Sequence, residues 1–193
     1  MSLRPRRLTV VWLSAAVAML LAGGLAWFQP WKLWLDQRVD EALPAIALIA
    51  AATPTPDIRS TDPATPPPNS TPSPIGPVLL STGRFISHEH ITSGSVSVVE
   101  LPDGSRILAI AGLNTSNGPD LHVWLSDAPV LPGSDGWHLF DDGSYLSLGT
   151  LKGNLGNQSY PIPRTADLSR LASVTIWCAR FKVSFGAAAL RAA

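Results

Sequence analysis

The sequence predicts an all-β domain, an antiparallel β-sandwich or barrel, preceded by one N-terminal transmembrane helix and a proline-rich linker. Three features lead to this prediction: an apolar run near the N-terminus, a proline-rich stretch after it, and short alternating segments separated by turns over the rest of the chain. The expected organisation is a basic cytoplasmic N-terminus (1–7), a transmembrane helix (8–28), a juxtamembrane amphipathic helix or neck (29–52), a Pro/Thr/Ser-rich disordered linker (53–77) and the β domain (78–193).

The charges of the chain balance, with 14 Lys and Arg against 14 Asp and Glu. A chain without excess positive charge creates no field that attracts nucleic acid, so nucleic acid is not an expected partner. Only 15% of the residues are charged, whereas an average soluble domain has about 25%. This low charge content, together with 46% hydrophobic residues, indicates that part of the chain lies in a membrane.

The run from Leu8 to Phe28 contains only Thr9 and Ser14 as polar residues. As a helix it would be about 31 Å long, which matches the hydrocarbon core of a bilayer. Three arginines within residues 1–7 precede the run and tryptophans follow it, a pattern that keeps the N-terminus cytoplasmic. We therefore expect a single-pass protein that contacts the lipid bilayer through this helix and has an extracytoplasmic C-terminal domain. A cleaved signal peptide is the alternative, since an arginine-led apolar run opens both kinds of segment.

Two segments separate this helix from the β domain. Apolar residues recur at helical spacing from Trp31 to Leu43, which predicts a short amphipathic helix at the outer leaflet. Pro44 interrupts it, and the apolar octet Ala45–Ala52 is too short to span a membrane. From Thr53 to Pro77, nine of 25 residues are proline, a composition that favours extended chain with a reach of up to roughly 75 Å. The linker is therefore expected to hold the β domain clear of the bilayer.

The remainder of the chain, from Val78 to Ala193, is the size of one ordinary domain and is expected to fold without the segments before it. No window in it has a sustained helical period, apart from a short turn at Asp167–Leu171, which favours an antiparallel sandwich or barrel. The candidate strands alternate or are apolar, and turn residues separate them: Ile91–Leu101, Arg106–Leu113, Leu121–Leu125, Tyr145–Leu151 and Val174–Phe185.

Cys178 is the only cysteine of the chain, so it cannot form an intramolecular disulfide. Its apolar surroundings, Ile176 to Ala179, fit a thiol that is buried as a small hydrophobic side chain. A reactive or metal-bound thiol is the alternative. Arg180 follows at the spacing that puts two side chains on one face of a strand, and a neighbouring arginine would lower the pKa of the thiol.

His88 and His90 are the candidate metal ligands that accompany this cysteine. Their spacing would point both imidazoles to one face of an extended chain, and with Cys178 they would form the His₂Cys set that copper prefers. Glu89 and the polar residues around them equally describe a solvated loop or edge strand. Covalent haem is excluded because the chain has no C-x-x-C-H motif.

Three segments of the predicted β domain resemble the DM13 domain family: Gly118–Ser126 (GPDLHVWLS), Leu148–Asn154 (LGTLKGN) and Val174–Phe181 (VTIWCARF). The resemblance covers roughly residues 80–191, and the N-terminal region is similar to that of membrane-anchored bacterial members. It implies an extracytoplasmic, β-rich domain with an electron-transfer role through the characteristic cysteine of the family, here Cys178, and hence a redox partner protein. It leaves the cofactor open between copper, non-covalently bound haem and none.

The sequence contains no motif of a conventional enzyme: G-x-S-x-G, H-E-x-x-H and the Walker A loop are all absent. Two function classes therefore remain. The first is a membrane-tethered redox or electron-transfer module that uses Cys178 and has a bound metal, an absorbance or a measurable potential. The second is a non-catalytic extracytoplasmic binding or scaffolding domain in which Cys178 is structural.

Overall fold

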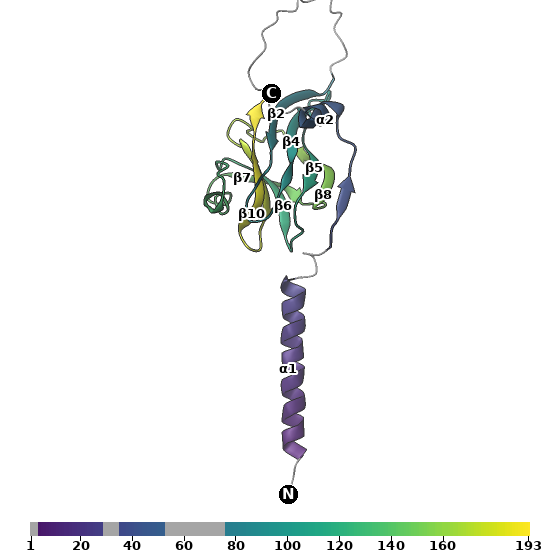
Figure 1. Ribbon diagram of the computed structural model, residues 1–193, viewed down its shortest axis with the longest axis vertical. Coiled ribbons are helices and arrows are strands. Elements are labelled where there is room, and N and C mark those ends of the chain that lie inside the picture. The colour runs from purple at the N-terminus through teal and green to yellow at the C-terminus, as the bar shows by residue number, and fades with distance from the viewer. Residues whose placement is uncertain (1–3, 29–34, 53–75) are drawn as a thin grey trace, which may run out of the picture.

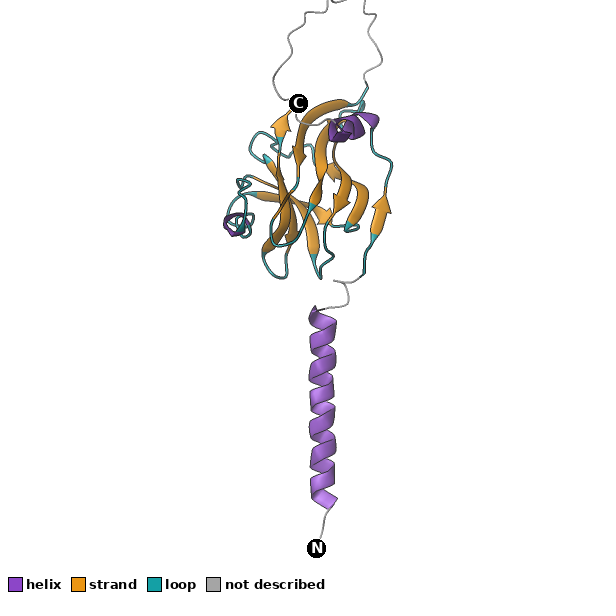
Figure 2. Ribbon diagram, viewed as in Figure 1, coloured by secondary structure: helices purple, strands orange, loops and turns teal. Residues whose placement is uncertain are grey.

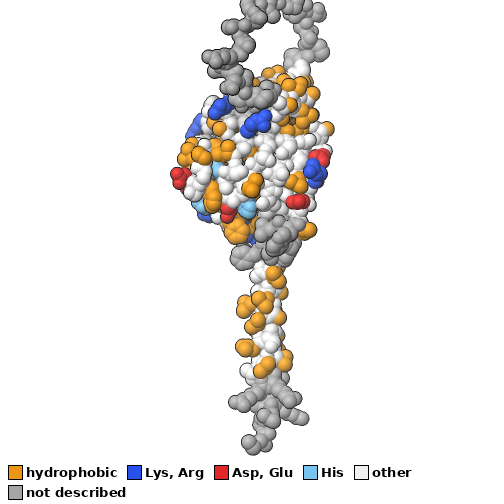
Figure 3. Space-filling view, viewed as in Figure 1, with side chains coloured by type: hydrophobic (Ala, Val, Ile, Leu, Met, Phe, Trp, Pro, Cys, Tyr) orange, Lys and Arg blue, Asp and Glu red, His pale blue; other side chains and the backbone are white. Residues whose placement is uncertain are grey.

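The computed structural model describes residues 4–28, 35–52 and 76–193 (Figure 1). Helix α1, Arg4–Phe28, contains the predicted transmembrane run, and its window Thr9–Ala26 is long and apolar enough to cross a membrane. None of this window is buried against the rest of the protein, and hydrophobic side chains are displayed along the helix (Figure 3). A signal sequence would have the same features, so α1 is a candidate membrane span.

The predicted all-β sandwich is confirmed, because two antiparallel-dominated sheets form the body of the described structure outside α1 (Figure 2). The six-stranded sheet has the order β1-β8-β5-β4-β2-β11 and the five-stranded sheet has the order β3-β10-β9-β6-β7. All neighbouring strands are antiparallel except β1 and β8, which are parallel. The elements are β1 (Arg38–Asp40), α2 (Ala45–Ala52), β2 (Val78–Arg84), β3 (Ile86–Ser87), β4 (Ser93–Glu100), β5 (Arg106–Asn114), β6 (Leu121–Ser126), η2 (Ser134–Gly136, a 3-10 helix), β7 (Tyr145–Thr150), β8 (Leu155–Ile162), β9 (Ser173–Cys178), β10 (Val183–Ala189) and β11 (Arg191–Ala192).

The main core lies between the two sheets. Alternate residues of each strand point into it, because successive side chains of a strand lie on opposite faces. Each aliphatic side chain buried there contributes about 1.5–3 kcal/mol relative to an exposed one. The segment Val174–Phe185, predicted as one strand, forms β9 and β10 with a turn at residues 179–182 between them. Aliphatic members of this core are Val96, Val98, Leu108, Ile110, Leu121, Val123, Leu125, Val174 and Ile176.

Residues 35–52 belong to the β domain, and we call them the strap. The amphipathic helix predicted over Trp31–Leu43 is wrong for the described residues 35–43, where β1 pairs with β8 instead. The amide of Leu155 donates to the carbonyl of Gln37 at 3.2 Å, and the amide of Glu41 donates to the carbonyl of Asn157 at 2.9 Å. An open sheet edge offers unpaired backbone groups. Residues 38–40 of the strap pair with this edge, although the spacing of the apolar residues is that of a helix. Residues 31–34 lie outside the described part of the chain.

Polar side chains fix the strap to β8 and the loop before it. Glu41 binds Lys152 at 2.6 Å and accepts hydrogen bonds from the amide and hydroxyl of Ser159, both at 2.9 Å. The hydrogen bond from Lys152, supported by those from Ser159, holds the pKa of the Glu41 carboxyl below its usual value. Asn154 accepts a hydrogen bond from the amide of Gln37 at 2.7 Å and donates one to Asp36 at 2.9 Å.

Helix α2 continues the strap over the outer face of the six-stranded sheet. Its Ala47 is buried against Val99 and Ala109, and the carbonyl of Ala51 accepts a hydrogen bond from Arg84 at 3.0 Å. Helix α2 and the start of β2 lie at the end of the sandwich where the C-terminus lies (Figure 1). The described residues on both sides of the proline-rich stretch therefore belong to one sandwich. The stretch itself, predicted as a disordered linker, lies outside the described part of the chain at residues 53–75.

Substitution of Gly156 by alanine tests the contact between the strap and β8. A Cβ added there would collide with the carbonyl oxygen of Val39, whereas a Cβ at Gly149 would meet nothing within 4 Å. Both glycines have positive φ, +101° and +128°, so both substitutions carry backbone strain. We expect Gly156→Ala to lower the free energy of unfolding by about 1–3 kcal/mol more than Gly149→Ala, as overpacking does.

Urea unfolding of the full-length variants measures this difference, and hydrogen exchange of the Val39 amide reports whether β1 leaves the sheet. Equal losses in the two variants, with unchanged exchange at Val39, would show that the strap does not pack against β8.

Candidate functional site

Cys178 is the last residue of β9, an interior strand of the five-stranded sheet. It pairs with Leu121 of β6 on one side and with Val183 of β10 on the other. Its side chain is 0% exposed and belongs to the core cluster between the sheets. The structure therefore places the thiol as a packed hydrophobic group, one of the two environments that the sequence left open.

Burial raises the pKa of the Cys178 thiol. Hydrogen bonds from the backbone of Phe181 and Arg180 oppose this effect, and the carboxylate of Asp120 adds to it. The predicted lowering of the thiol pKa by the Arg180 side chain is wrong, because β9 ends at Cys178 and the chain turns at residues 179–182. Cys178 is consequently a protonated thiol at neutral pH rather than a reactive thiolate.

His88 is nearly buried, and both of its ring nitrogens have partners. Nε2 lies 3.1 Å from the carbonyl oxygen of Leu131, and Nδ1 lies 2.7 Å from the hydroxyl of Ser184. A carbonyl only accepts hydrogen bonds, so Nε2 carries the proton and Nδ1 accepts from Ser184. Burial lowers the pKa of His88, against a smaller opposing effect of the Leu131 hydrogen bond. This histidine is a neutral, hydrogen-bonded structural residue with no nitrogen open to a metal.

His90 has a different environment from His88. Its ring lies against Phe185, with 3.9 Å between the ring centroids, and its Nε2 lies 3.8 Å from Glu89. Strand β3 ends at Ser87, so the rule that alternate residues share a face does not hold over His88 and His90. Within residues 4–28, 35–52 and 76–193, no group of three or more His, Cys, Asp or Glu side chains could hold a metal ion. The structure does not bring His88, His90 and Cys178 together, and the residues do not fit copper.

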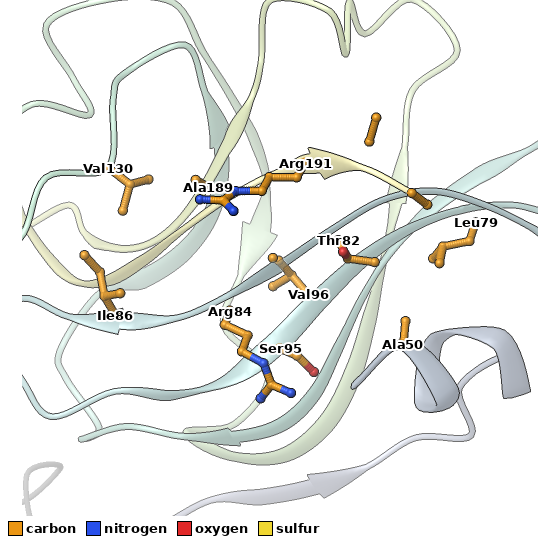
Figure 4. Close-up of a pocket in the computed structure, with 13 residues that line it drawn as sticks. Ala50, Leu79, Thr82, Arg84, Ile86, Ser95, Val96, Val130, Ala189 and Arg191 are labelled. Atoms are coloured by element: carbon orange, nitrogen blue, oxygen red, sulfur yellow. The ribbon is translucent and has the colours of Figure 1, made fainter. Parts of the chain in front are cut away.

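A groove of about 840 Å³ opens beside β2 and the C-terminal strands. Figure 4 shows Arg84 and Arg191 within it, among apolar walls that include Ile86 and Val130. Among the described residues, no His, Cys, Met or Tyr lines this groove, so these residues offer none of the usual axial ligands of haem iron. Cys178 lies in the closed core instead. The groove therefore does not fit a haem site.

Three aromatic rings stack on the outer face of the five-stranded sheet. Tyr145 of β7 and Trp124 of β6 are nearly parallel, with 4.0 Å between centroids and an interplanar angle of 7°. Trp124 in turn stacks on Trp177 of β9 at 5.2 Å and 27°. Trp177 and Cys178 are neighbours in sequence but lie on opposite faces of β9. The stack could not be predicted from the sequence, because strand alternation indicates the outward position of each tryptophan but not the register between strands.

These features define a class of protein: an all-β sandwich domain with a single thiol sealed in its core and oxidisable aromatic rings stacked behind the strand that carries it. A family model described as "Electron transfer DM13" matches residues 84–190, more than half of the chain. The chain belongs to the DM13 family, which confirms the resemblance of its three sequence segments. No curated protein and no solved structure gave a significant match.

Replacement of Cys178 tests its environment. We expect Cys178→Ala to lower the free energy of unfolding by about 1 kcal/mol through a small cavity. Cys178→Ser should cost a further ~1–3 kcal/mol, because it buries a hydroxyl without an assured partner. The native thiol should react slowly with a thiol reagent at pH 7, since it is covered and protonated. Urea unfolding and thiol titration measure these effects. Immediate modification of the folded protein, or equal stability of all three proteins, would contradict the burial of the thiol.

Proposed function

We propose that this DM13 protein is a membrane-tethered electron-transfer domain in which Cys178 is the redox group. The match to the electron-transfer family carries the proposal, since its range of residues 84–190 includes Cys178. Cys178 lies in the segment Val174–Phe181 that resembles the family, and the resemblance implies that the redox role of the family falls on this cysteine. The redox partner is a protein that exchanges electrons one at a time.

The sealed position of Cys178 favours one-electron exchange over thiol–disulfide exchange. A disulfide forms by direct attack between sulfur atoms and needs a thiolate, whereas this thiol is covered and burial raises its pKa. In the proposed step, the S–H group gives one electron to an oxidised partner protein and its proton to the carboxylate of Asp120. Asp120 acts electrostatically on the thiol and binds Nε2 of His122 at 2.9 Å. This pair leads the proton toward solvent, because both side chains are partly exposed.

Helix α1 is the proposed anchor, with the arginines of residues 1–7 on the cytoplasmic side. Only six residues, 29–34, separate α1 from the strap, which limits the gap between Phe28 and Leu35 to about 25 Å. The carbonyl of Leu35 accepts a hydrogen bond from Asn117, and the amide of Ala179 donates to the carbonyl of Asp120. The loop between β5 and β6 thus joins the start of the strap to the Cys178 end of the sandwich. This arrangement supports electron transfer close to the bilayer.

The second candidate is a binding or scaffolding domain in which Cys178 is structural. One observation favours it: a fully buried cysteine with a raised pKa behaves as an ordinary small core residue. The two candidates differ in whether removal of the sulfur abolishes a redox couple.

The decisive comparison uses the full-length protein in detergent, as wild type and as Cys178→Ala. The wild type should exchange electrons with a soluble one-electron mediator in voltammetry, and the variant should lose this couple while retaining the circular dichroism spectrum of the fold. Metal analysis and a visible spectrum of the same samples detect any bound cofactor. A colourless, metal-free protein with the same voltammetric response with and without the sulfur would leave the binding domain as the better account.

The proposed topology predicts the accessibility of tags at the two ends of the chain. An epitope after Ala193 should bind antibody on intact protoplasts, and an epitope before Met1 should bind only after lysis, because the arginines hold that end inside. Mass spectrometry of the purified protein provides the control. A mature chain that lacks α1 would identify a cleaved signal peptide, and the reverse accessibility would overturn the orientation.

A further inference from the structure

We propose that Tyr145, Trp124 and Trp177 form a one-electron relay between the protein surface and the strand that carries Cys178. The inference rests on the proposed electron-transfer function and gives the buried sulfur a route to its partner. The relay residues lie on three adjacent strands, β7, β6 and β9, which form one continuous hydrogen-bonded part of the sheet.

The stack leads from solvent to the interior. Tyr145 is 47% exposed, Trp124 is 7% exposed and Trp177 is 1% exposed. Centroid distances of 4.0 and 5.2 Å put each ring in van der Waals contact with the next. From Trp177 the path to Cys178 crosses a single peptide unit. A partner protein that docks over Tyr145 thus reaches the sulfur without opening the core.

The residue types fit this role. Tyrosine and tryptophan are the aromatic side chains that lose one electron most readily, and phenylalanine does not do so under comparable conditions. Phe140 also touches Trp177, edge-on at 6.3 Å, but it cannot extend the relay. Tyr145 is therefore the outlet of the stack to the surface.

The indole of Trp124 has a second property that a relay needs. Its Nε1 is buried and has no hydrogen-bond partner among the described residues. An oxidised indole that cannot pass its N–H proton to a neighbour remains a radical cation, which readily takes an electron from the next ring. The structure thus avoids a proton acceptor that would trap the charge at this intermediate position.

The full step balances in electrons and protons. A one-electron oxidant on the partner protein takes an electron from Tyr145, whose phenol proton passes to solvent because the side chain is exposed. The proton returns when Trp124 gives Tyr145 an electron, and the electron vacancy then moves from Trp124 to Trp177. The S–H group of Cys178 fills it by losing one electron, and its proton passes to the carboxylate of Asp120. The three rings return to their initial state, and a reduced partner reverses the step along the same path.

A purely structural role is the alternative explanation of the stack, because Trp124 and Trp177 also belong to a small core cluster with Phe140. Tyr145→Phe separates the two roles. It keeps a stacked ring and removes only the readily oxidised phenol, so a structural role predicts no change in electron transfer. Tyr145→Trp restores an oxidisable ring at the same position.

The experiment uses the full-length chain with Trp12, Trp27, Trp31 and Trp34 replaced by phenylalanine in every sample, so that these tryptophans do not react with the oxidant. Photogenerated tris(bipyridine)ruthenium(III) serves as the one-electron oxidant. Transient absorption records tyrosyl and indole radicals, and thiol titration after denaturation records the loss of Cys178. Trp137→Phe, a tryptophan outside the stack, is the matched control.

We expect Tyr145→Phe and Trp124→Phe to slow the oxidation of Cys178 about tenfold, equivalent to about 1.4 kcal/mol in the barrier. Tyr145→Trp and Trp137→Phe should retain the original rate. Unchanged rates in Tyr145→Phe and Trp124→Phe would overturn the relay. Should Trp124→Phe fail to fold, Tyr145→Phe decides the outcome alone. Radical formation at Trp177 that depends on Tyr145 but leaves the thiol intact would support the relay and overturn the redox role of Cys178.

Discussion

The edge of β8 is the constraint on which the organisation of this chain depends. Without a neighbour, β8 would end the six-stranded sheet with a row of unpaired amides and carbonyls. β1 covers this edge in parallel register, and Glu41 and Asn154 fasten it with side-chain hydrogen bonds. Once β1 is fixed, α2 follows onto the face of the same sheet and buries Ala47. The strap, which begins seven residues after the end of the candidate membrane helix, is thereby built into the β domain.

Strand β9 carries a thiol on one face and an indole on the other. Because alternate side chains of a strand face opposite sides, Cys178 points into the core between the sheets while Trp177 points to the outer face. The first environment keeps the sulfur protonated and inaccessible, and the second supplies a stacked path to the surface. If Cys178 has the proposed redox role, this position lets it exchange an electron while direct reaction of its sulfur with solvent or other thiols is suppressed.

Local patterns in the sequence predicted the parts of the structure that depend on local rules. Strand alternation identified the sandwich and the apolar setting of Cys178. The helix expected over Trp31–Leu43 failed because its pairing partner, β8, lies more than a hundred residues away in the chain. The expectations for Arg180 and for His88 with His90 assumed strands that continue, whereas β9 ends at Cys178 and β3 ends at Ser87. The aromatic stack depends on the register of β6, β7 and β9, which no single segment of the sequence specifies.

The position of the strap also changes what a single cut in the chain would do. A protease that cleaves between residues 53 and 75 would divide the protein into two fragments, one with α1, β1 and α2 and the other with the remaining strands. The two fragments would stay associated through the β1–β8 pairing, the Glu41–Lys152 ion pair and the packing of Ala47. Shedding of the domain would then be a dissociation step, with a rate set by the opening of the strap rather than by proteolysis. The fragment with α1 and the fragment with the remaining strands would behave as the two subunits of a complex that is encoded in one chain.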